Sequence, residues 1–180
     1  MRYIFIGMKH CGKTTHGRIF AESRKLPFYD TDDLLESLHR KKTGKTENCR
    51  TIFNAYGAEY FNELESELIE NIYQGAYSSS VIAMGGRMPI NDKLQDKLKK
   101  LGFYVYVKAP TEAIFKRIKR KGLPAFIDQD RPFDSVCEMI QQREPYYERL
   151  ANITIEVNDL PVKIIAGQIK LKIRESENGR

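Results

Sequence analysis

Residues 7–14 read Gly-Met-Lys-His-Cys-Gly-Lys-Thr and carry side chains suited to binding phosphate. Backbone N–H groups in a loop of this pattern surround an anion, and the start of the following helix adds positive charge. Gly7 and Gly12 let the backbone approach phosphate oxygens closely. Lys13 is then placed to bridge the outer phosphates of a nucleotide, and Thr14 to hold Mg²⁺. The alternative, a tight turn followed by a solvated lysine, does not require all four fixed positions.

A group of acids, Asp30, Asp32 and Asp33, follows a short apolar run at Leu26–Asp30. If that run is a strand, the acids lie at the edge of the sheet where ligands bind in open α/β folds. We expect Asp30 to reach Mg²⁺ through its hydration shell, and Asp32 to orient and deprotonate an acceptor hydroxyl. Helix capping is the other use of such residues, and we assign it to Thr31 or Asp33.

Two glycines and an arginine, Gly85, Gly86 and Arg87, follow a second apolar run at Ser80–Met84. Glycines at the end of a strand allow a ligand or another backbone to approach, so we expect this turn to form the floor of the acceptor pocket. An ordinary turn carrying a solvated arginine has the same sequence. No acid follows this run, which leaves Asp30 and Asp32 as the best carboxylates on the metal side.

These residues must be positioned by a sheet and its helices, and the sequence alternates short β-rich runs with longer amphipathic segments. That alternation predicts an α/β fold with a five-stranded parallel sheet and helices on both faces. The expected strands are Tyr3–Gly7, Leu26–Asp30, Ser80–Met84, Phe103–Val107 and Ile153–Val157. The expected helices are Lys13–Ser23, Asp32–Lys41, Glu59–Tyr73, Asp92–Leu101, Thr111–Lys121, Pro132–Arg149 and Val162–Arg174.

Three segments do not fit this alternation. Lys42–Arg50 is polar, and Gly122–Arg131 combines glycine, proline and charged residues, so both are expected to be mobile loops of the kind that cover an active site. The tail Glu175–Arg180 is expected to be disordered.

Length and composition exclude several classes of protein. The 180 residues, 41% of them hydrophobic, predict a single domain over residues 1–180. No apolar run approaches the roughly 18 residues of a membrane helix, and no secretory signal is recognisable, so a cytoplasmic protein without a membrane partner is expected. Cys11, Cys49 and Cys137 form neither a disulfide framework nor a zinc motif.

The formal net charge is +6, but lysine and arginine are scattered among acids rather than clustered. A phosphorylated small molecule accounts for this excess as well as nucleic acid does. We expect a monomer whose partner is a small-molecule acceptor, with no nucleic acid bound.

These motifs together resemble the shikimate kinase family over nearly the whole chain. The resemblance implies ATP-dependent phosphorylation of a ring hydroxyl on shikimate, a three-layer fold with sheet order 2-3-1-4-5, an acceptor-binding segment at about 31–62 and a mobile lid at about 119–131. The matching segments are Gly7–Thr15, Phe28–Asp32 with Glu36, Ile52–Phe53, Gly57, Phe61–Glu65, Met84–Gly86, Arg143–Tyr147 and Val157–Pro161.

The resemblance also assigns residues to each ligand. Thr15 packs on its helix and is expected to touch the α-phosphate with its hydroxyl. Arg117, Asn158 and Pro161 are expected to border the nucleotide base. A guanidinium stacks well on an adenine face, and a solvated helix charge is the alternative for Arg117. Arg143 is expected to bind the acceptor carboxylate, although a surface ion pair is the alternative.

The departures from the family fall on acceptor recognition. The family has an arginine after Phe61 and another in the lid, where this chain has Asn62 and Leu123, while Glu65 is retained. Losing one charge-assisted contact to a carboxylate typically costs about 1.5–3 kcal/mol, so shikimate is expected to be a poor substrate unless another cation enters the pocket. Arg87 is the new cation that the sequence places there.

Two classes of function stay open at this point. The first is a kinase that transfers a phosphoryl group from ATP to a small metabolite, with shikimate as the first candidate and another hydroxylated acid, a polyol or a nucleoside-like acceptor as rivals. The second is a non-catalytic nucleotide-binding module that has lost acceptor binding.

Overall fold

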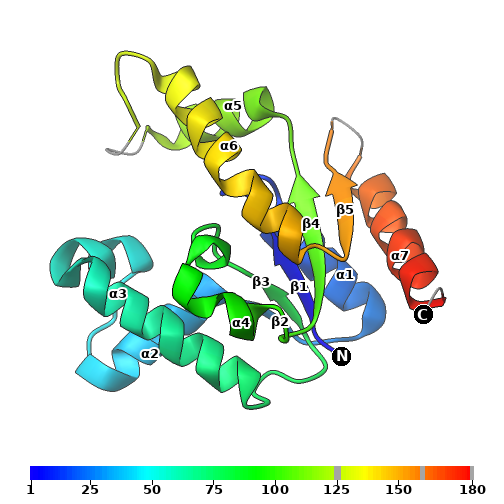
Figure 1. Ribbon diagram of the computed structural model, residues 1–180, viewed down its shortest axis with the longest axis horizontal. Helices are drawn as coiled ribbons and strands as arrows, with labels where there is room; N and C mark the ends of the chain where they lie inside the picture. The colour runs from blue at the N-terminus through cyan, green and yellow to red at the C-terminus, as the bar shows by residue number, and fades with distance from the viewer. Residues whose placement is uncertain (124–126, 159–160, 179–180) are drawn as a thin grey trace.

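The computed structural model describes residues 1–123, 127–158 and 161–178. Five parallel strands form one central sheet in the order β2-β3-β1-β4-β5, which confirms the expected fold and strand order (Figure 1). The strands are β1 Tyr3–Ile6, β2 Phe28–Asp30, β3 Val81–Ala83, β4 Phe103–Lys108 and β5 Ile153–Glu156.

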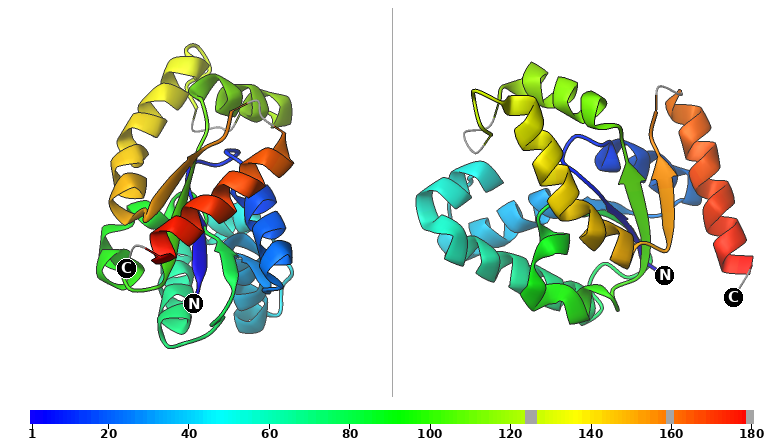
Figure 2. Two further views of the ribbon diagram at one scale, coloured as in Figure 1. Left: turned by 90° about the vertical axis from the view of Figure 1, so that its right-hand side faces the viewer. Right: turned by 45° about the horizontal axis from the view of Figure 1, so that its top comes forward.

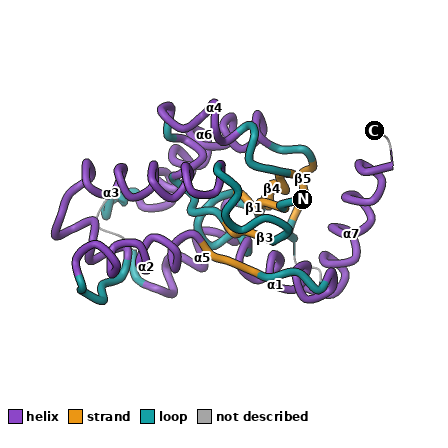
Figure 3. The backbone as a smooth tube through the Cα atoms, turned by 90° about the horizontal axis from the view of Figure 1, so that it is seen from below, coloured by secondary structure: helices purple, strands orange, loops and turns teal. Residues whose placement is uncertain are grey.

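Helices cover both faces of this sheet. Helices α1 and α7 pack on each other over one face, and α6 with α4 lies over the opposite face (Figures 2 and 3). The helices are α1 Lys13–Arg24, α2 Thr31–Thr43, α3 Cys49–Tyr73, α4 Gln95–Leu98, α5 Thr111–Lys121, α6 Pro132–Leu150 and α7 Val162–Asn178, with 3₁₀ turns η1 Met88–Ile90 and η2 Asp92–Leu94. No helix in the described ranges is both long and apolar enough to span a membrane.

The inner strands form the core because both of their faces are covered. All residues of β1 and β3 are buried, as are the first five of β4, whereas the edge strands β2 and β5 are largely half-buried. This is why the central strands are continuous apolar runs instead of alternating ones. Since all strands run in parallel, the residues that follow them emerge at one edge of the sheet.

The α2–α3 pair forms an arm at one end of the molecule, opposite α7 (Figure 3). Residues 42–50, expected to be a loop, are partly helical, because α2 extends to Thr43 and Asn48 caps the start of α3 by accepting the Thr51 N–H at 2.9 Å. Helix α3 breaks at Gly57, where φ is 81°. His39 joins the two helices through its Nδ1, which lies 2.9 Å from the Tyr60 hydroxyl.

Two further expectations were wrong. A single helix over Asp92–Leu101 is replaced by η2 and the short α4, because the Asn91 side chain accepts the Lys93 N–H and starts a tight turn. The tail, expected to be disordered from Glu175, continues α7 as far as Asn178. Glu177 anchors this last turn by accepting a 2.6 Å hydrogen bond from the Tyr3 hydroxyl, and it lies 3.6 Å from the Arg24 guanidinium.

Candidate active site

The phosphate-binding loop, defined as Gly7–Thr14, connects β1 to α1 at the carboxyl edge of the sheet. Gly7 has a φ of 139°, and a Cβ at this position would lie 2.4 Å from the Val107 carbonyl oxygen. No other residue fits there without moving the backbone of β4. Gly12 begins α1 without any side-chain cap, so the first N–H groups of the helix are not taken up by a capping side chain. The loop can thus offer backbone donors and the helix dipole to an anion.

Lys13 is the buried cation of this loop and is only 9% exposed. Its ammonium donates to the carbonyl oxygens of Gly7 at 3.0 Å and Met8 at 2.8 Å. A buried ammonium needs such acceptors because desolvation of an unpaired charge is costly. Phosphate oxygens would compete with these carbonyls for the same donors.

Thr14 and Asp30 meet next to the loop. The Thr14 hydroxyl donates to Asp30 Oδ2 at 2.9 Å, so the two residues expected to hold Mg²⁺ lie together. The other carboxylate oxygen, Oδ1, accepts the Asp32 N–H at 3.1 Å, which makes Asp30 the N-cap of α2. The expected cap at Thr31 or Asp33 is therefore wrong, because Asp30 has the extended backbone that a cap requires.

The pair of hard oxygen donors at Thr14 and Asp30 fits Mg²⁺, which usually takes one or two protein ligands and keeps water or phosphate oxygens for the rest. Within the described ranges no three His, Cys, Asp or Glu side chains gather into a metal centre. Thr15 is exposed and does not pack into the core as expected, which leaves its hydroxyl accessible beside the loop.

Asp32 lies between the phosphate-binding loop and the turn after β3. Desolvation by the surrounding protein raises its pKa, as do the carboxylates of Asp30 and Glu36, while Lys9 and Lys13 act in the opposite direction. A Cβ on Gly85 would lie 3.2 Å from Asp32 Oδ1, so the carboxylate faces this turn. An acid with a raised pKa is suited to accept a proton from a hydroxyl.

The Gly85–Gly86 turn joins three parts of the site. The Thr31 hydroxyl accepts the Gly85 N–H at 2.8 Å, which fixes the turn to the first residue of α2. A Cβ on Gly86 would lie 3.2 Å from the Gly7 carbonyl oxygen, so the turn packs closely against the phosphate-binding loop. The Tyr147 hydroxyl, from α6, donates to the Gly86 carbonyl at 2.6 Å.

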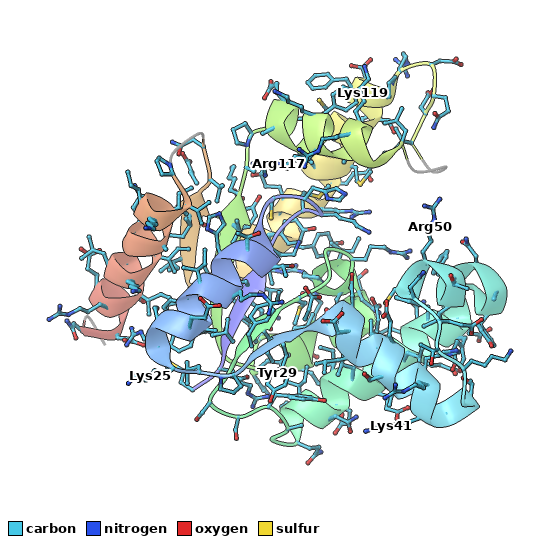
Figure 4. All side chains as sticks on the ribbon, turned by 180° about the vertical axis from the view of Figure 1, so that it is seen from behind. Lys25, Tyr29, Lys41, Arg50, Arg117 and Lys119 are labelled. Carbon is cyan, nitrogen blue, oxygen red and sulfur yellow. The ribbon has the colours of Figure 1, made fainter. Side chains whose placement is uncertain are left out.

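Of the three residues expected at the nucleotide base, Arg117 contacts the phosphate-binding loop. Arg117 lies between α5 and the loop, where its guanidinium donates to the His10 carbonyl at 2.8 Å (Figure 4). Asn158 and Pro161 are exposed and flank the end of β5, with residues 159–160 outside the described part of the chain. The structure thus places Arg117 directly at the phosphate-binding loop.

The acceptor side holds a buried acid and several cations. Glu65 is 6% exposed, and burial raises its pKa to about 7 although Arg87 and the Asn91 side chain lower it. The Arg87 guanidinium carbon lies 5.4 Å from the centre of the Phe53 ring. Asn62 is exposed on α3. The described residues therefore place a positive charge near Glu65 from the β3 side rather than from position 62.

Arg143 and Leu123 are the remaining residues that were considered for the acceptor side and the lid. Arg143 is half-buried on α6 and lies close enough to the Tyr147 hydroxyl to lower its pKa, against the burial that raises it. Leu123 is half-buried at the start of the lid segment. Residues 124–126 lie outside the described residues, so the structure leaves the expected lid closure untested.

Three residues of the site were not predicted from the sequence. Tyr147 was recognised as part of a motif, but its hydrogen bond to Gly86 was not foreseen. Lys9 was given no role, yet it lies near enough to Asp32 to lower the pKa of that carboxyl. Phe53 carries the Arg87 guanidinium. In the sequence, the only sign of this contact was that an aromatic residue, Phe53, and an unusual arginine, Arg87, are both present.

Comparison with known proteins agrees with this geometry. A family model described as shikimate kinase matches residues 9–174. A shikimate kinase from Clostridium botulinum (strain 657 / Type Ba4) is 36% identical over 158 residues, which cover 86% of this chain and 87% of the relative. One from Caldanaerobacter subterraneus subsp. tengcongensis is 33% identical over 177 residues, covering 95% and 98%.

A solved structure of similar fold is the shikimate kinase from Acinetobacter baumannii in complex with shikimate. It superposes with a TM-score of 0.81 at 26% identity, covering 97% of this chain and 93% of that one. These similarities extend over nearly the whole sequence and include both sides of the site. They support the kinase over the non-catalytic nucleotide-binding module. The chain belongs to the shikimate kinase family and is a small-molecule kinase.

Proposed function

We propose that the protein transfers the γ-phosphoryl group of ATP to a ring hydroxyl of shikimate. The observation that carries this proposal is the position of Asp32, whose carboxylate lies beside the Gly85 turn and within electrostatic range of Lys13. An acceptor hydroxyl at Asp32 would therefore be close to the phosphate-binding loop. Family membership names the acceptor, since the matched relatives are shikimate kinases.

On the nucleotide side, backbone N–H groups of the loop bind phosphate oxygens and Lys13 neutralises charge on the outer phosphates. Thr14 and Asp30 are the residues that would hold Mg²⁺, which neutralises phosphate charge when bound. Arg117, held at the loop by the His10 carbonyl, borders the base together with the Asn158–Pro161 segment. Thr15 offers its exposed hydroxyl to the α-phosphate.

On the acceptor side, Asp32 orients the hydroxyl and accepts its proton on a carboxylate oxygen as the oxygen attacks phosphorus. Its raised pKa brings it closer to the working pH than an ordinary aspartate, which favours proton acceptance. Gly85 and Gly86 form the floor, and Arg143, which lies on α6 near the Tyr147 hydroxyl, binds the carboxylate.

The proposal also includes the acceptor-binding segment, the lid, the location of the protein and its partners. The acceptor-binding segment is residues 31–62, and the lid is residues 119–131, which close over the bound substrates. We expect a cytoplasmic monomer that binds neither nucleic acid nor membrane.

The proposal is tested by measuring ADP release from ATP and Mg²⁺ with and without shikimate, and by identifying the phosphorylated product by ³¹P NMR. ADP release that depends on shikimate and disappears in Lys13→Ala is expected. A panel of other hydroxylated acids, polyols and nucleosides is run in parallel. Acceptor-independent ADP release, or faster turnover with a neutral polyol than with shikimate, would contradict the proposal.

A further inference from the structure

The acceptor side contains a buried acid, Glu65, that has no basic partner at position 62. Glu65 is buried on the inner face of α3, and a buried carboxylate needs a nearby positive charge or hydrogen-bond donors. Asn62, three residues earlier on the same helix, is exposed and neutral, so it cannot supply that charge. The groups that lower the pKa of Glu65, the Arg87 charge and the Asn91 side-chain hydrogen bond, both come from outside α3.

Arg87 supplies it from the turn between β3 and η1. The positive charge of Arg87 lowers the pKa of Glu65, while the Asp32 carboxylate raises it. Arg87 and Asp32 therefore both lie within electrostatic range of Glu65. The Phe53 ring, from the first half of α3, lies beside the Arg87 guanidinium, with 5.4 Å between the ring centre and the guanidinium carbon. The Phe53 and Phe61 rings in turn meet edge to face at 5.8 Å. The guanidinium thus lies over an aromatic ring and within electrostatic range of a buried acid.

The same guanidinium retains donors for a ligand. Arg87 is exposed, and no acceptor among the described residues takes a hydrogen bond from it. A guanidinium has five N–H donors in a fixed plane and binds a carboxylate with two of them at once. Arg87 directly follows Gly86, whose carbonyl is bonded to Tyr147, and Arg143 lies near that same Tyr147 hydroxyl. Two cations therefore lie near the Gly86 turn, where the acceptor is expected to bind.

We propose that Arg87 is the specificity-determining residue that binds the carboxylate of the acceptor, taking over from the β3 side the charge that position 62 lacks. Glu65 is then a positioning residue that orients the Arg87 guanidinium, with Phe53 limiting its movement. This inference rests on the proposed function, because it takes shikimate as the acceptor. It predicts an anionic acceptor and disfavours neutral polyols at this site.

The test compares shikimate with its methyl ester, in which the carboxylate is neutral, for the parent protein and for Arg87→Ala. The substitution is expected to raise the KM for shikimate on the order of 10- to 100-fold, the loss of one charge-assisted contact. The KM for ATP and the KM for the ester should stay within about twofold, since neither involves the lost contact. Arg174→Ala, which removes an exposed arginine on α7 at the other end of the molecule, is the matched control.

A second variant tests whether the cation that binds the acceptor can be supplied from position 62 instead of position 87. Asn62→Arg introduced into Arg87→Ala should recover most of the lost affinity for shikimate, because it returns a cation to the face of α3 that carries Glu65. Arg87→Gln replaces Arg87→Ala if the latter does not give the parent's circular dichroism spectrum.

The outcomes separate the two claims. If the parent phosphorylates shikimate and Arg87→Ala leaves its KM unchanged, or changes acid and ester equally, Arg87 has only a structural role and this inference is wrong while the function stands. If the parent neither binds nor phosphorylates shikimate, both claims fall.

Discussion

On the nucleotide side of the site, the phosphate-binding groups lie in one continuous loop, Gly7–Thr14, whereas on the acceptor side the charges come from α3, from the turn after β3 and from α6. The first side works through backbone N–H groups, whose directions depend on a fixed loop conformation. The second works through long charged side chains, which can reach one point from several elements. The difference explains why the loop keeps its full pattern while the cation that we propose for the acceptor, Arg87, stands outside position 62.

The two sides are nevertheless fixed to each other. Gly86 packs against the phosphate-binding loop and accepts the hydrogen bond of Tyr147, and Gly85 is bonded to Thr31 at the start of α2. A change on either side that moves this turn would affect both substrates. Changes in separate side chains should affect one substrate at a time, and this distinction can be tested.

The largest effect is expected for Lys13→Ala. The substitution removes the charge on the outer phosphates, and turnover should fall on the order of 10⁴-fold, as for other cations that contact a transferred phosphoryl group. Steady-state kinetics measure the loss, and circular dichroism checks the fold. Lys9→Ala, in the same loop, is the control and should lose less than about tenfold because Lys9 only influences Asp32 from a distance. Lys13→Ala turnover within tenfold of the parent would contradict the proposed nucleotide site.

Asp32→Asn should lower turnover by roughly a thousandfold, since it removes the proton acceptor for the hydroxyl. ATP affinity, measured by titration calorimetry, should change little, because Asp30 rather than Asp32 contacts Thr14. Asp33→Asn in the same helical turn is the matched control. An equal loss of ATP affinity in Asp32→Asn would move Asp32 to the metal side and break the separation between the two regions.

Glu65→Gln tests the buried charge on the acceptor side. Between its ordinary pKa of 4.5 and about 7, folded Glu65 holds a proton that the unfolded chain releases, so its contribution to stability falls as pH rises and is lost near pH 7. The shift corresponds to roughly 3 kcal/mol. Urea unfolding at about pH 5 and pH 8 should show a smaller loss of stability in Glu65→Gln than in the parent. The exposed Glu63→Gln should retain the parent's pH dependence, and an unchanged profile in Glu65→Gln would show that the pKa of Glu65 is not raised in the folded protein.

The smallest effect is expected for Tyr147→Phe, which removes the hydrogen bond between α6 and the Gly86 carbonyl. The free energy of unfolding should fall by about 1 kcal/mol. The KM values for ATP and the acceptor should rise together, because the Gly85–Gly86 turn borders both sites. Tyr146→Phe is the control next to it. A rise confined to one substrate would show that the turn does not couple the two regions.

The sequence predicted the elements best where periodicity and local signals agree. The helix at Thr111–Lys121 was predicted with the bounds it has, and the five strands were each placed within about two residues. The final turn of α7 was missed because the Tyr3–Glu177 contact that anchors it joins the two ends of the chain. The cap at Asp30 was misassigned because the end of β2 decides which neighbouring acid has extended backbone.

The phosphate-binding loop was determined by sequence alone, because its function resides in consecutive residues whose glycines and lysine have few other uses in that order. The acceptor site was decided by the tertiary structure. Glu65, Arg87 and Phe53 belong to segments that come together only when α3 packs beside the turn after β3. Electrostatic interactions depend on distance in space, so the sequence could identify Arg87 as an unusual cation, but only the fold places its charge beside Glu65.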